Sequence, residues 1–146
     1  MSILTTPTQS SCLQINDYIC IKNRPCQIID KSISKTGKHG GCKLHLIAVD
    51  IFNNQRHEHL VMSTKNIDVP YISKTDYQLV SIDDNIVSYF DKDGKILNDL
   101  FLPNITDSDV KLSNELKNKY ENDEEIFITV VSAMNISEIK GYKTKK

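Results

Sequence analysis

The residues with the clearest chemical potential form the segment from Ser34 to Gly41, which reads Ser-Lys-Thr-Gly-Lys-His-Gly-Gly. Its central lysine, Lys38, has a glycine on one side and His-Gly-Gly on the other. Glycine adopts backbone angles that other residues avoid, and it adds no side-chain bulk. The pattern therefore predicts a sharp turn that leaves one unobstructed lysine at its tip, accessible to a modifying enzyme, to RNA or to both.

The Gly-Lys pair also invites comparison with the phosphate-binding loop G-x-x-x-x-G-K-[ST]. That loop needs its first glycine where this chain has Ser32, and a magnesium-binding Ser or Thr where it has His39. A helix follows such a loop, whereas the residues after Gly41 are typical of a strand. These differences exclude a nucleotide-binding loop of this type.

His57 and His59 are the best candidates for metal ligands, because residues two apart on a strand share one face. A zinc site needs further ligands at paired spacing, and the sequence indicates none. Packed or exposed histidines are therefore the simpler interpretation. The sequence also contains no pattern typical of a nucleophile with its base and acid, so a hydrolase is not expected.

The cysteines are even in number but include no C-x-x-C pair, which favours reduced thiols over a zinc site. Cys42, close to several lysines, is either a reactive thiol or a small apolar residue at the start of a strand, and the second is preferred. The first residues lack the basic start and apolar run of a signal peptide, and no segment is apolar enough to span a bilayer. We therefore expect a cytoplasmic protein. The cysteines are Cys12, Cys20, Cys26 and Cys42.

Charge is unevenly distributed along the chain. The 146 residues are 39% hydrophobic and 25% charged, with a net charge of −1, which is ordinary for a globular protein. Residues 1–71 hold eight Lys/Arg and five Asp/Glu, whereas residues 72–146 hold ten Lys and fourteen Asp/Glu. From Lys31 to Lys43 there are four lysines and no acid. This basic segment can contact phosphates even though the whole chain is nearly neutral.

The elements that must position the lysine segment are mostly β-strands. Two strands flank it, and with two more they suggest a small antiparallel barrel carrying a long hairpin. Proline cannot donate a ladder hydrogen bond, so strand pairing is expected to stop near residues 66–70, at a domain junction. The expected strands are residues 17–22, 26–33, 43–52 and 57–62.

The second half predicts three strands, one helix and a further strand, which fit a five-stranded OB-type barrel if one more strand is irregular. Asp93-Gly94 marks a hairpin turn. Ser113 is a reasonable N-cap for the helix, and Leu112, Leu116 and Tyr120 fall on one buried stripe. A short helix is expected near residue 137. The expected strands are residues 77–82, 86–90, 96–102 and 126–134, and the helix is residues 113–120.

The motif Ser-Lys-Thr-Gly-Lys-His-Gly at residues 34–40 resembles the loop of the hypusine-containing eukaryotic translation initiation factor 5A family. The resemblance continues in register over roughly residues 12–139. This loop is highly specific to the family. Further matches are Arg-Pro-Cys at 24–26, Asp-Ile-Phe at 50–52, Asp-Val-Pro at 68–70, Asp-Tyr-Gln-Leu at 76–79, Ile-Asp-Asp at 82–84 and Thr-Val-Val-Ser-Ala-Met at 129–134.

The resemblance implies a mainly β protein of two small barrels. Residues 15–71 would form an SH3-like domain that carries the long projecting hairpin with Lys38. Residues 72–146 would form an OB-like domain with one helix and a basic C-terminal tail. Residues 1–14 are expected to be a flexible N-terminal tail, because they are rich in Ser and Thr and lack an apolar run.

The resemblance also implies a function for Lys38. In the family, deoxyhypusine synthase transfers an aminobutyl group from spermidine to this lysine with NAD, and an iron-dependent deoxyhypusine hydroxylase then completes hypusine. The modified factor binds the ribosome, both rRNA and peptidyl-tRNA, relieves stalls at proline-rich sequences and assists termination. The implied contacts of the modifying enzymes and the tRNA are Ser34, Lys35, Thr36, Gly37, His39, Gly40, Gly41 and Lys43.

On this interpretation the protein is not an enzyme, binds no cofactor or metal, and is a monomer or weak homodimer. The chain departs from the family's loop at Ile33, Gly41 and Cys42, where the family has Thr, His and Ala. Gly41 is expected to make the second arm of the hairpin more flexible. The alternative is an unmodified RNA- or protein-binding module of SH3 and OB type. Tight, salt-sensitive binding of a short single strand by residues 72–146 would favour that alternative.

Overall fold

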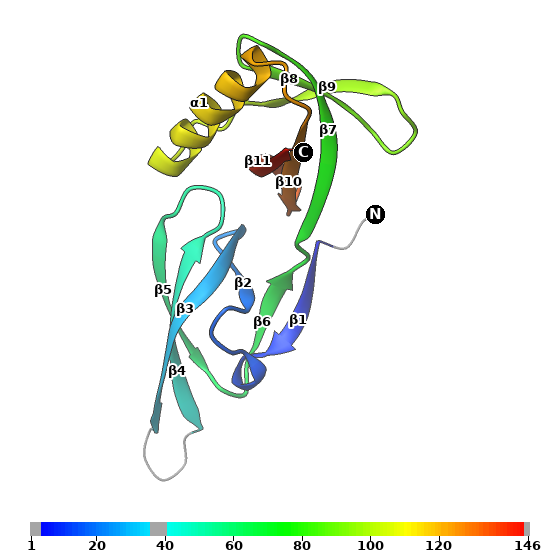
Figure 1. Ribbon diagram of the computed structural model, residues 1–146. Coiled ribbons are helices and arrows are strands. Elements are labelled where there is room, and N and C mark those ends of the chain that lie inside the picture. The colour runs from blue at the N-terminus through cyan, green and yellow to red at the C-terminus, as the bar shows by residue number, and fades with distance from the viewer. Residues whose placement is uncertain (1–3, 36–40, 145–146) are drawn as a thin grey trace. The chain divides into compact units, whose positions relative to one another are not determined.

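The computed structural model describes residues 4–35 and 41–144 (Figure 1). The chain divides into two compact units, Met1–Tyr71 and Ile72–Lys146, and each is described by itself. The described residues form strands, one short 3-10 helix and one α-helix, so the expectation of a mainly β protein with one helix is confirmed. No helix in the described residues is long and apolar enough to cross a membrane.

The first unit contains two antiparallel sheets. A four-stranded sheet has the order β2-β3-β4-β5, and a two-stranded sheet pairs β1 with β6. The strands are β1 (Thr5–Gln9), β2 (Tyr18–Ile21), β3 (Arg24–Lys35), β4 (Cys42–Asp50), β5 (Arg56–Met62) and β6 (Asn66–Pro70), and the 3-10 helix η1 spans Ser10–Cys12.

The core of the first unit follows from the alternation of apolar residues along its strands. In β4, Leu44, Leu46 and Ala48 are two residues apart, so all three face the same side and are buried. They pack in one cluster with Ile19 of β2 and Ile28 of β3. Burying these apolar side chains stabilises the sheet that carries the lysine segment.

The N-terminal residues differ from the expected flexible tail of residues 1–14, and that prediction is wrong for residues 5–13. β1 pairs with β6 over its whole length, from Thr5 opposite Pro70 to Gln9 opposite Asn66. Leu13 is only 3% exposed and belongs to the core. Strand pairing was also expected to stop near residues 66–70, which is wrong, because β6 pairs with β1 as far as Pro70. Proline is accommodated here because a two-stranded sheet has only edge strands, which tolerate proline.

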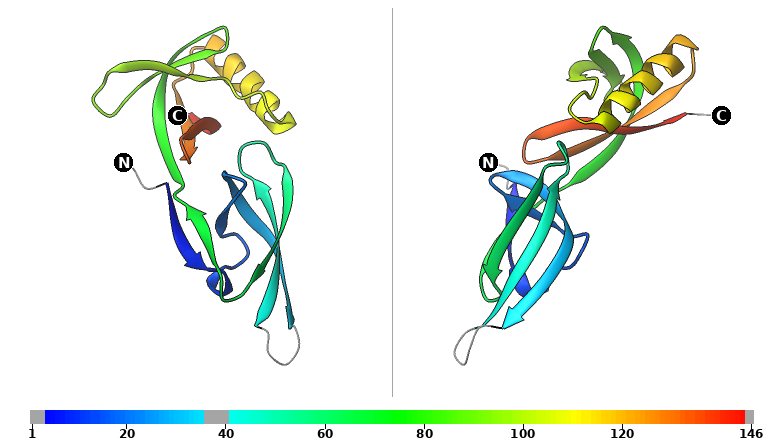
Figure 2. Two further views of the ribbon diagram at one scale, coloured as in Figure 1. Left: turned by 180° about the vertical axis from the view of Figure 1, so that it is seen from behind. Right: turned by 90° about the vertical axis from the view of Figure 1, so that its left-hand side faces the viewer.

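The second unit is a curled five-stranded sheet of order β11-β10-β7-β8-β9, beside which α1 packs (Figure 2). The buried core includes Val87, Leu116, Ile126, Ile128 and Ile139. The elements are β7 (Ser73–Asp83), β8 (Ile86–Phe90), β9 (Ile96–Phe101), α1 (Asp107–Glu121), β10 (Ile126–Ala133) and β11 (Ile136–Thr144).

The helix begins six residues earlier than the sequence predicted. Thr106 is its N-cap, and it forms a reciprocal capping box with Asp109, which satisfies two backbone N–H groups of the first turn. Ser113, the predicted N-cap, lies inside the helix, where its hydroxyl donates to the carbonyl of Pro103. The predicted stripe is confirmed, since Leu116 is fully buried and Leu112 packs beside it.

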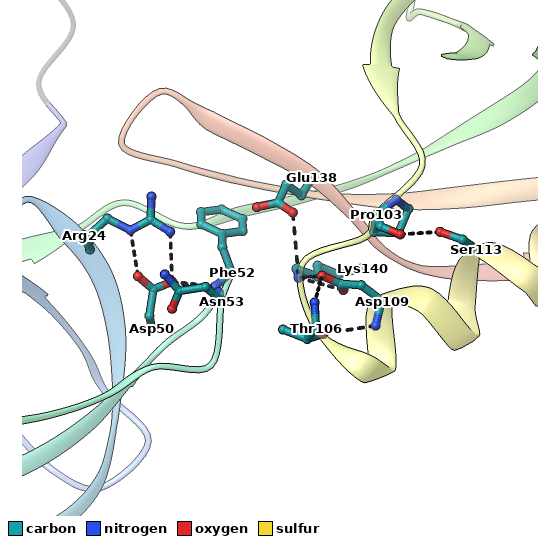
Figure 3. Close-up of polar contacts among 10 residues, drawn as sticks. All are labelled: Arg24, Asp50, Phe52, Asn53, Pro103, Thr106, Asp109, Ser113, Glu138 and Lys140. Carbon is teal, nitrogen blue, oxygen red and sulfur yellow. Dashed lines mark hydrogen bonds and ion pairs between the residues drawn. The ribbon is translucent and has the colours of Figure 1, made fainter. Parts of the chain in front are cut away.

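The C-terminal segment forms a strand rather than the short helix expected near residue 137. β11 pairs with β10 from Ile126 opposite Thr144 to Ala133 opposite Ile136. Lys140 of β11 donates to Asp109 at 3.0 Å and thereby ties the strand to the start of α1 (Figure 3). The strand pairing and this ion pair outweigh a weak local preference for helix.

Candidate functional site

The lysine segment lies at the end of the β3–β4 hairpin. β3 and β4 are antiparallel, with Ser34 opposite Lys43 and Lys35 opposite Cys42. The chain between these strand ends contains Thr36, Gly37, Lys38, His39 and Gly40, which lie outside the described residues. The described structure thus fixes the base on which Lys38 is carried.

The described residues on either side of Lys38 are accessible. Ser34, Lys35, Gly41 and Lys43 are all exposed. In the described parts of the chain, neither Lys35 nor Lys43 forms an ion pair with an acidic side chain. Their positive charge therefore stays available to an anionic partner such as a phosphate.

A third strand stiffens the hairpin. β2 pairs with β3 only as far as Gln27, so β3 continues to Lys35 past the end of its outer neighbour. On the other side, β5 follows β4 as far as Lys43, which lies opposite Met62. The described part of β4 is therefore a central strand almost to its end, which limits bending of the base that carries Lys38.

The turn after β5, residues 63–65, contacts the end of the hairpin that leads to Lys38, which is called the hairpin base here. The backbone N–H of Ser63 donates to the carbonyl of Cys42 at 2.8 Å. Gly41 lies beside this turn, and a Cβ atom on Gly41 would sit 3.5 Å from the hydroxyl of Ser63, an ordinary contact. The backbone of Gly41 is outside the left-handed region. This position therefore accepts a side chain, and the local geometry does not require glycine.

Ser10 holds the 63–65 turn from the side of the N-terminal strand. It is completely buried, and its backbone N–H donates to the carbonyl of Lys65 at 2.9 Å. Its hydroxyl donates to the carbonyl of Met62 at 2.8 Å. Sequence reasoning missed this residue, because a serine in a Ser/Thr-rich segment gives no signal that distant carbonyls need it. Residues once expected to be a tail thus support the hairpin base.

We expect a Ser10→Ala substitution to lower the free energy of unfolding by about 1–3 kcal/mol, because it removes one partner of a buried hydrogen bond. It should also speed hydrogen exchange at the amide of Ser63, which the same turn positions. Chemical denaturation and amide exchange measure the two effects, with exposed Ser11→Ala as the control. Unchanged exchange at Ser63 would show that Ser10 does not support the turn.

An ion pair with a buried carboxylate and a partly exposed guanidinium fixes the opposite end of the hairpin (Figure 3). The guanidinium of Arg24, at the start of β3, donates to Asp50, at the end of β4, with Nε–Oδ2 and Nη2–Oδ1 distances of 2.7 and 3.3 Å. The backbone N–H groups of Phe52 and Asn53 also donate to Asp50 Oδ1, at 2.8 and 3.1 Å. One carboxylate therefore joins both strands and the turn that follows them.

The environment of Asp50 keeps it ionised. Burial by itself raises the pKa of this carboxyl group, but the hydrogen bonds from Arg24, Phe52 and Asn53 favour the charged form and outweigh burial. The pKa of Asp50 consequently lies below its ordinary value.

The thiols of the described residues are unpaired, and burial varies among them. Burial, together with the nearby carboxylate of Asp50, raises the pKa of Cys26 to about 11, so this thiol stays protonated at neutral pH. Cys42, at the first position of β4, is partly buried. A reactive role for either thiol receives no support from this geometry.

The candidate metal ligands His57 and His59 share one face of β5, as expected. Within residues 4–35 and 41–144, no group of three or more His, Cys, Asp or Glu side chains could hold a metal ion. His45 of β4 instead contacts Glu58 of β5, with an Nε2–Oε2 distance of 3.4 Å.

Comparison with known proteins places both units in one family. Residues 4–65 match the model "Translation initiation factor 5A-like, N-terminal". Residues 71–143 match the model "Eukaryotic elongation factor 5A hypusine, DNA-binding OB fold". Together the two matches cover nearly the whole chain.

Individual relatives agree with these models. The eukaryotic translation initiation factor 5A-2 of Schizosaccharomyces pombe is 45% identical over 131 residues, 90% of this chain and 75% of that protein. Factor 5A-1 of Arabidopsis thaliana is 41% identical over 140 residues, 95% and 86% of the two chains. A solved family structure from Naegleria fowleri is 34% identical, covers 97% of this chain and 99% of its own, and superposes with a TM-score of 0.92. The chain therefore belongs to the eukaryotic translation initiation factor 5A family.

Proposed function

We propose that this chain is a translation factor that binds the ribosome beside the peptidyl-tRNA and acts through a hypusine formed on Lys38. It promotes peptide-bond formation at stalled sequences, such as proline runs, and assists termination. The observation that supports this proposal most directly is the intact motif at residues 34–40, carried by a hairpin with exposed flanking lysines.

The geometry of the hairpin suits a crowded RNA environment. A thin hairpin enters a space that excludes a globular domain, and a base with three strands carries its end without large bending. The charges of Lys35 and Lys43, which form no ion pair with the acidic side chains that the structure describes, attract phosphates. Neutralising phosphates releases counterions, so binding should weaken as salt rises. A hypusine adds length and a second amine, which extends positive charge toward the tRNA end.

The proposed action is positioning. Holding the end of the peptidyl-tRNA lowers the entropic part of the barrier for a poor nucleophile such as prolyl-tRNA. The ribosome performs the chemistry, so the factor itself need not be an enzyme and needs no bound cofactor. Its place of action is the cytoplasm, as a monomer or weak homodimer.

Two enzymes complete the proposed set of partners. Deoxyhypusine synthase acts on Lys38, and deoxyhypusine hydroxylase acts on the product. Both would contact the flanking residues Ser34, Lys35, Gly41 and Lys43, together with Thr36, Gly37, His39 and Gly40.

Incubation of the purified chain with deoxyhypusine synthase, NAD and labelled spermidine tests the modification. We expect one label per chain, at Lys38, and none in a Lys38→Arg variant. Lys35→Arg is the matched control, because it changes an exposed lysine of the same hairpin and should still accept the label. A label on another lysine, or no label on the chain without a substitution, would contradict the proposed site.

A further inference from the structure

The curled sheet of the second unit has a polar cavity. Residues from all five strands line it, and its volume is about 370 Å³, within the range of about 300–1,000 Å³ typical of small-ligand sites. Here two buried apolar residues, Leu100 and Val130, line the cavity, and the other lining residues are polar or aromatic.

Two tyrosine rings form one wall of the cavity. Tyr77 of β7 and Tyr89 of β8 lie with their ring centroids 4.9 Å apart, at an interplanar angle of 51°. Tyr89 is almost fully buried. Ring faces held in this way attract cations through their electron-rich centres.

A carboxylate faces the same space. Asp99 of β9 accepts a hydrogen bond from the hydroxyl of Tyr89 at 2.5 Å, through Oδ1. In the described residues, no side chain donates to its other oxygen, Oδ2. The pairing of β8 with β9 shifts register between Val87 and Tyr89, opposite Asp99, and such irregularities commonly redirect side chains beside binding sites.

The rest of the rim supplies oxygen atoms that accept hydrogen bonds. The hydroxyls of Ser132 and Ser137, on β10 and β11, lie 2.7 Å apart, and Asn135 sits in the turn between these strands. No lysine, arginine or histidine is among the described residues that line the cavity. Residues 72–146 carry more acids than lysines, which adds a negative field around it.

We propose that this cavity binds an organic cation, an alkylammonium or guanidinium group. The charge pairs with Asp99, the apolar stem lies against Tyr77 and Tyr89, and the remaining N–H groups donate to the serine hydroxyls. A small free amine and the side chain of a Lys or Arg from another protein share this chemistry. The residues that line the cavity all belong to the second unit, whereas Lys38 belongs to the first.

Titration of the full-length, isotope-labelled chain with Nα-acetyl-arginine amide tests the proposal. We expect saturable shifts in the amide signals of Ser132, Asn135 and Ser137. The citrulline analogue has the same shape without the charge, and it should bind about tenfold more weakly, the loss of one charge-assisted hydrogen bond. Asp99→Asn should weaken arginine binding similarly. Asp93→Asn, an equal charge change in the exposed β8–β9 turn, should not.

Agmatine and a Gly-Arg-Gly peptide then separate the two sources of the cation. Tighter binding of the peptide indicates a side chain of a protein partner, and tighter binding of agmatine indicates a small amine. Equal affinity for arginine and citrulline amides would overturn the proposal, and this comparison requires no variant. Absence of saturable shifts with every cation, or the same shifts with uridine monophosphate instead, would overturn it too.

Discussion

A chain with Lys38→Arg is expected to fold normally and to lose its activity at proline runs. Arginine keeps a positive charge, but its guanidinium is not deprotonated in proteins and cannot accept the aminobutyl group as a lysine amine does. The substitution therefore separates charge from modification. In cells that depend on this chain, we expect the rate of peptide-bond formation at a proline run, followed with a reporter, to fall by about tenfold, which corresponds to about 1.4 kcal/mol of activation free energy.

The control for this experiment is Lys35→Arg, which changes an exposed lysine of the same hairpin. A reporter without a proline run shows whether general translation is intact. If Lys38→Arg supported the proline-run reporter as well as the unchanged chain, positioning by hypusine would be the wrong mechanism. A loss of equal size in Lys35→Arg would instead assign the effect to hairpin charge.

The largest expected effect on stability comes from Asp50→Asn. The substitution removes the charge from a fully buried carboxylate that pairs with Arg24, whose side chain is 35% exposed. Breaking a buried ion pair costs about 3–5 kcal/mol, and the partial exposure of Arg24 places the expected loss near the lower end, about 3 kcal/mol. Chemical denaturation measures this loss, and Asp68→Asn, an exposed carboxylate of the same unit, is the matched control. A loss as small as that of the control would mean that the pair does not hold the two strands together.

The carboxylate of Asp50 also predicts how the free energy of unfolding changes with pH. Its pKa is lower in the folded chain than the value of about 3.9 expected when unfolded. The unfolded chain therefore binds more protons in this range, so the stabilisation is complete above the unfolded pKa and is lost as pH falls through the folded pKa. Asp50→Asn should flatten this acid-side loss in a series of denaturation curves. An equally steep loss in the variant would assign the acid sensitivity to other groups.

The parts of the fold that follow local patterns could be predicted from sequence. β4 alternates apolar residues at 44, 46 and 48 and lies between the turn-forming segments at 37–41 and 53–55, so its position was clear. The Asp-Gly pair at 93–94 likewise predicted the turn between β8 and β9, where Gly94 has a φ of 80°.

The parts that depend on distant partners could not be predicted. β1 is a strand because β6, some 60 residues later, pairs with it, and its own Thr and Pro residues give little apolar alternation. A short helix was expected near residue 137 on local preference, but β11 is a strand because its pairing with β10 outweighs that preference. The start of α1 was predicted too late, because Ser113 is also a residue type suited to an N-cap. In the structure the N-cap is Thr106, which forms a capping box with Asp109.

The candidate site likewise has residues that could be predicted from the sequence and residues that could not. The lysine motif is contiguous, so sequence alone pointed to Lys38 and its neighbours. The residues that hold the base of the hairpin are not contiguous, since Ser10 contacts carbonyls at Met62 and Lys65. Their roles arise only after folding brings the N-terminal strand beside the turn after β5.

We propose above that the function of this chain depends on a modification carried by Lys38. Peptide mass analysis of the protein purified from its own cells tests it most directly, by reading the mass of residue 38. We expect a lysine with an added aminobutyl group, with or without a hydroxyl. A bare lysine throughout would contradict it, and an unmodified RNA- or protein-binding module would then be the better description of this chain.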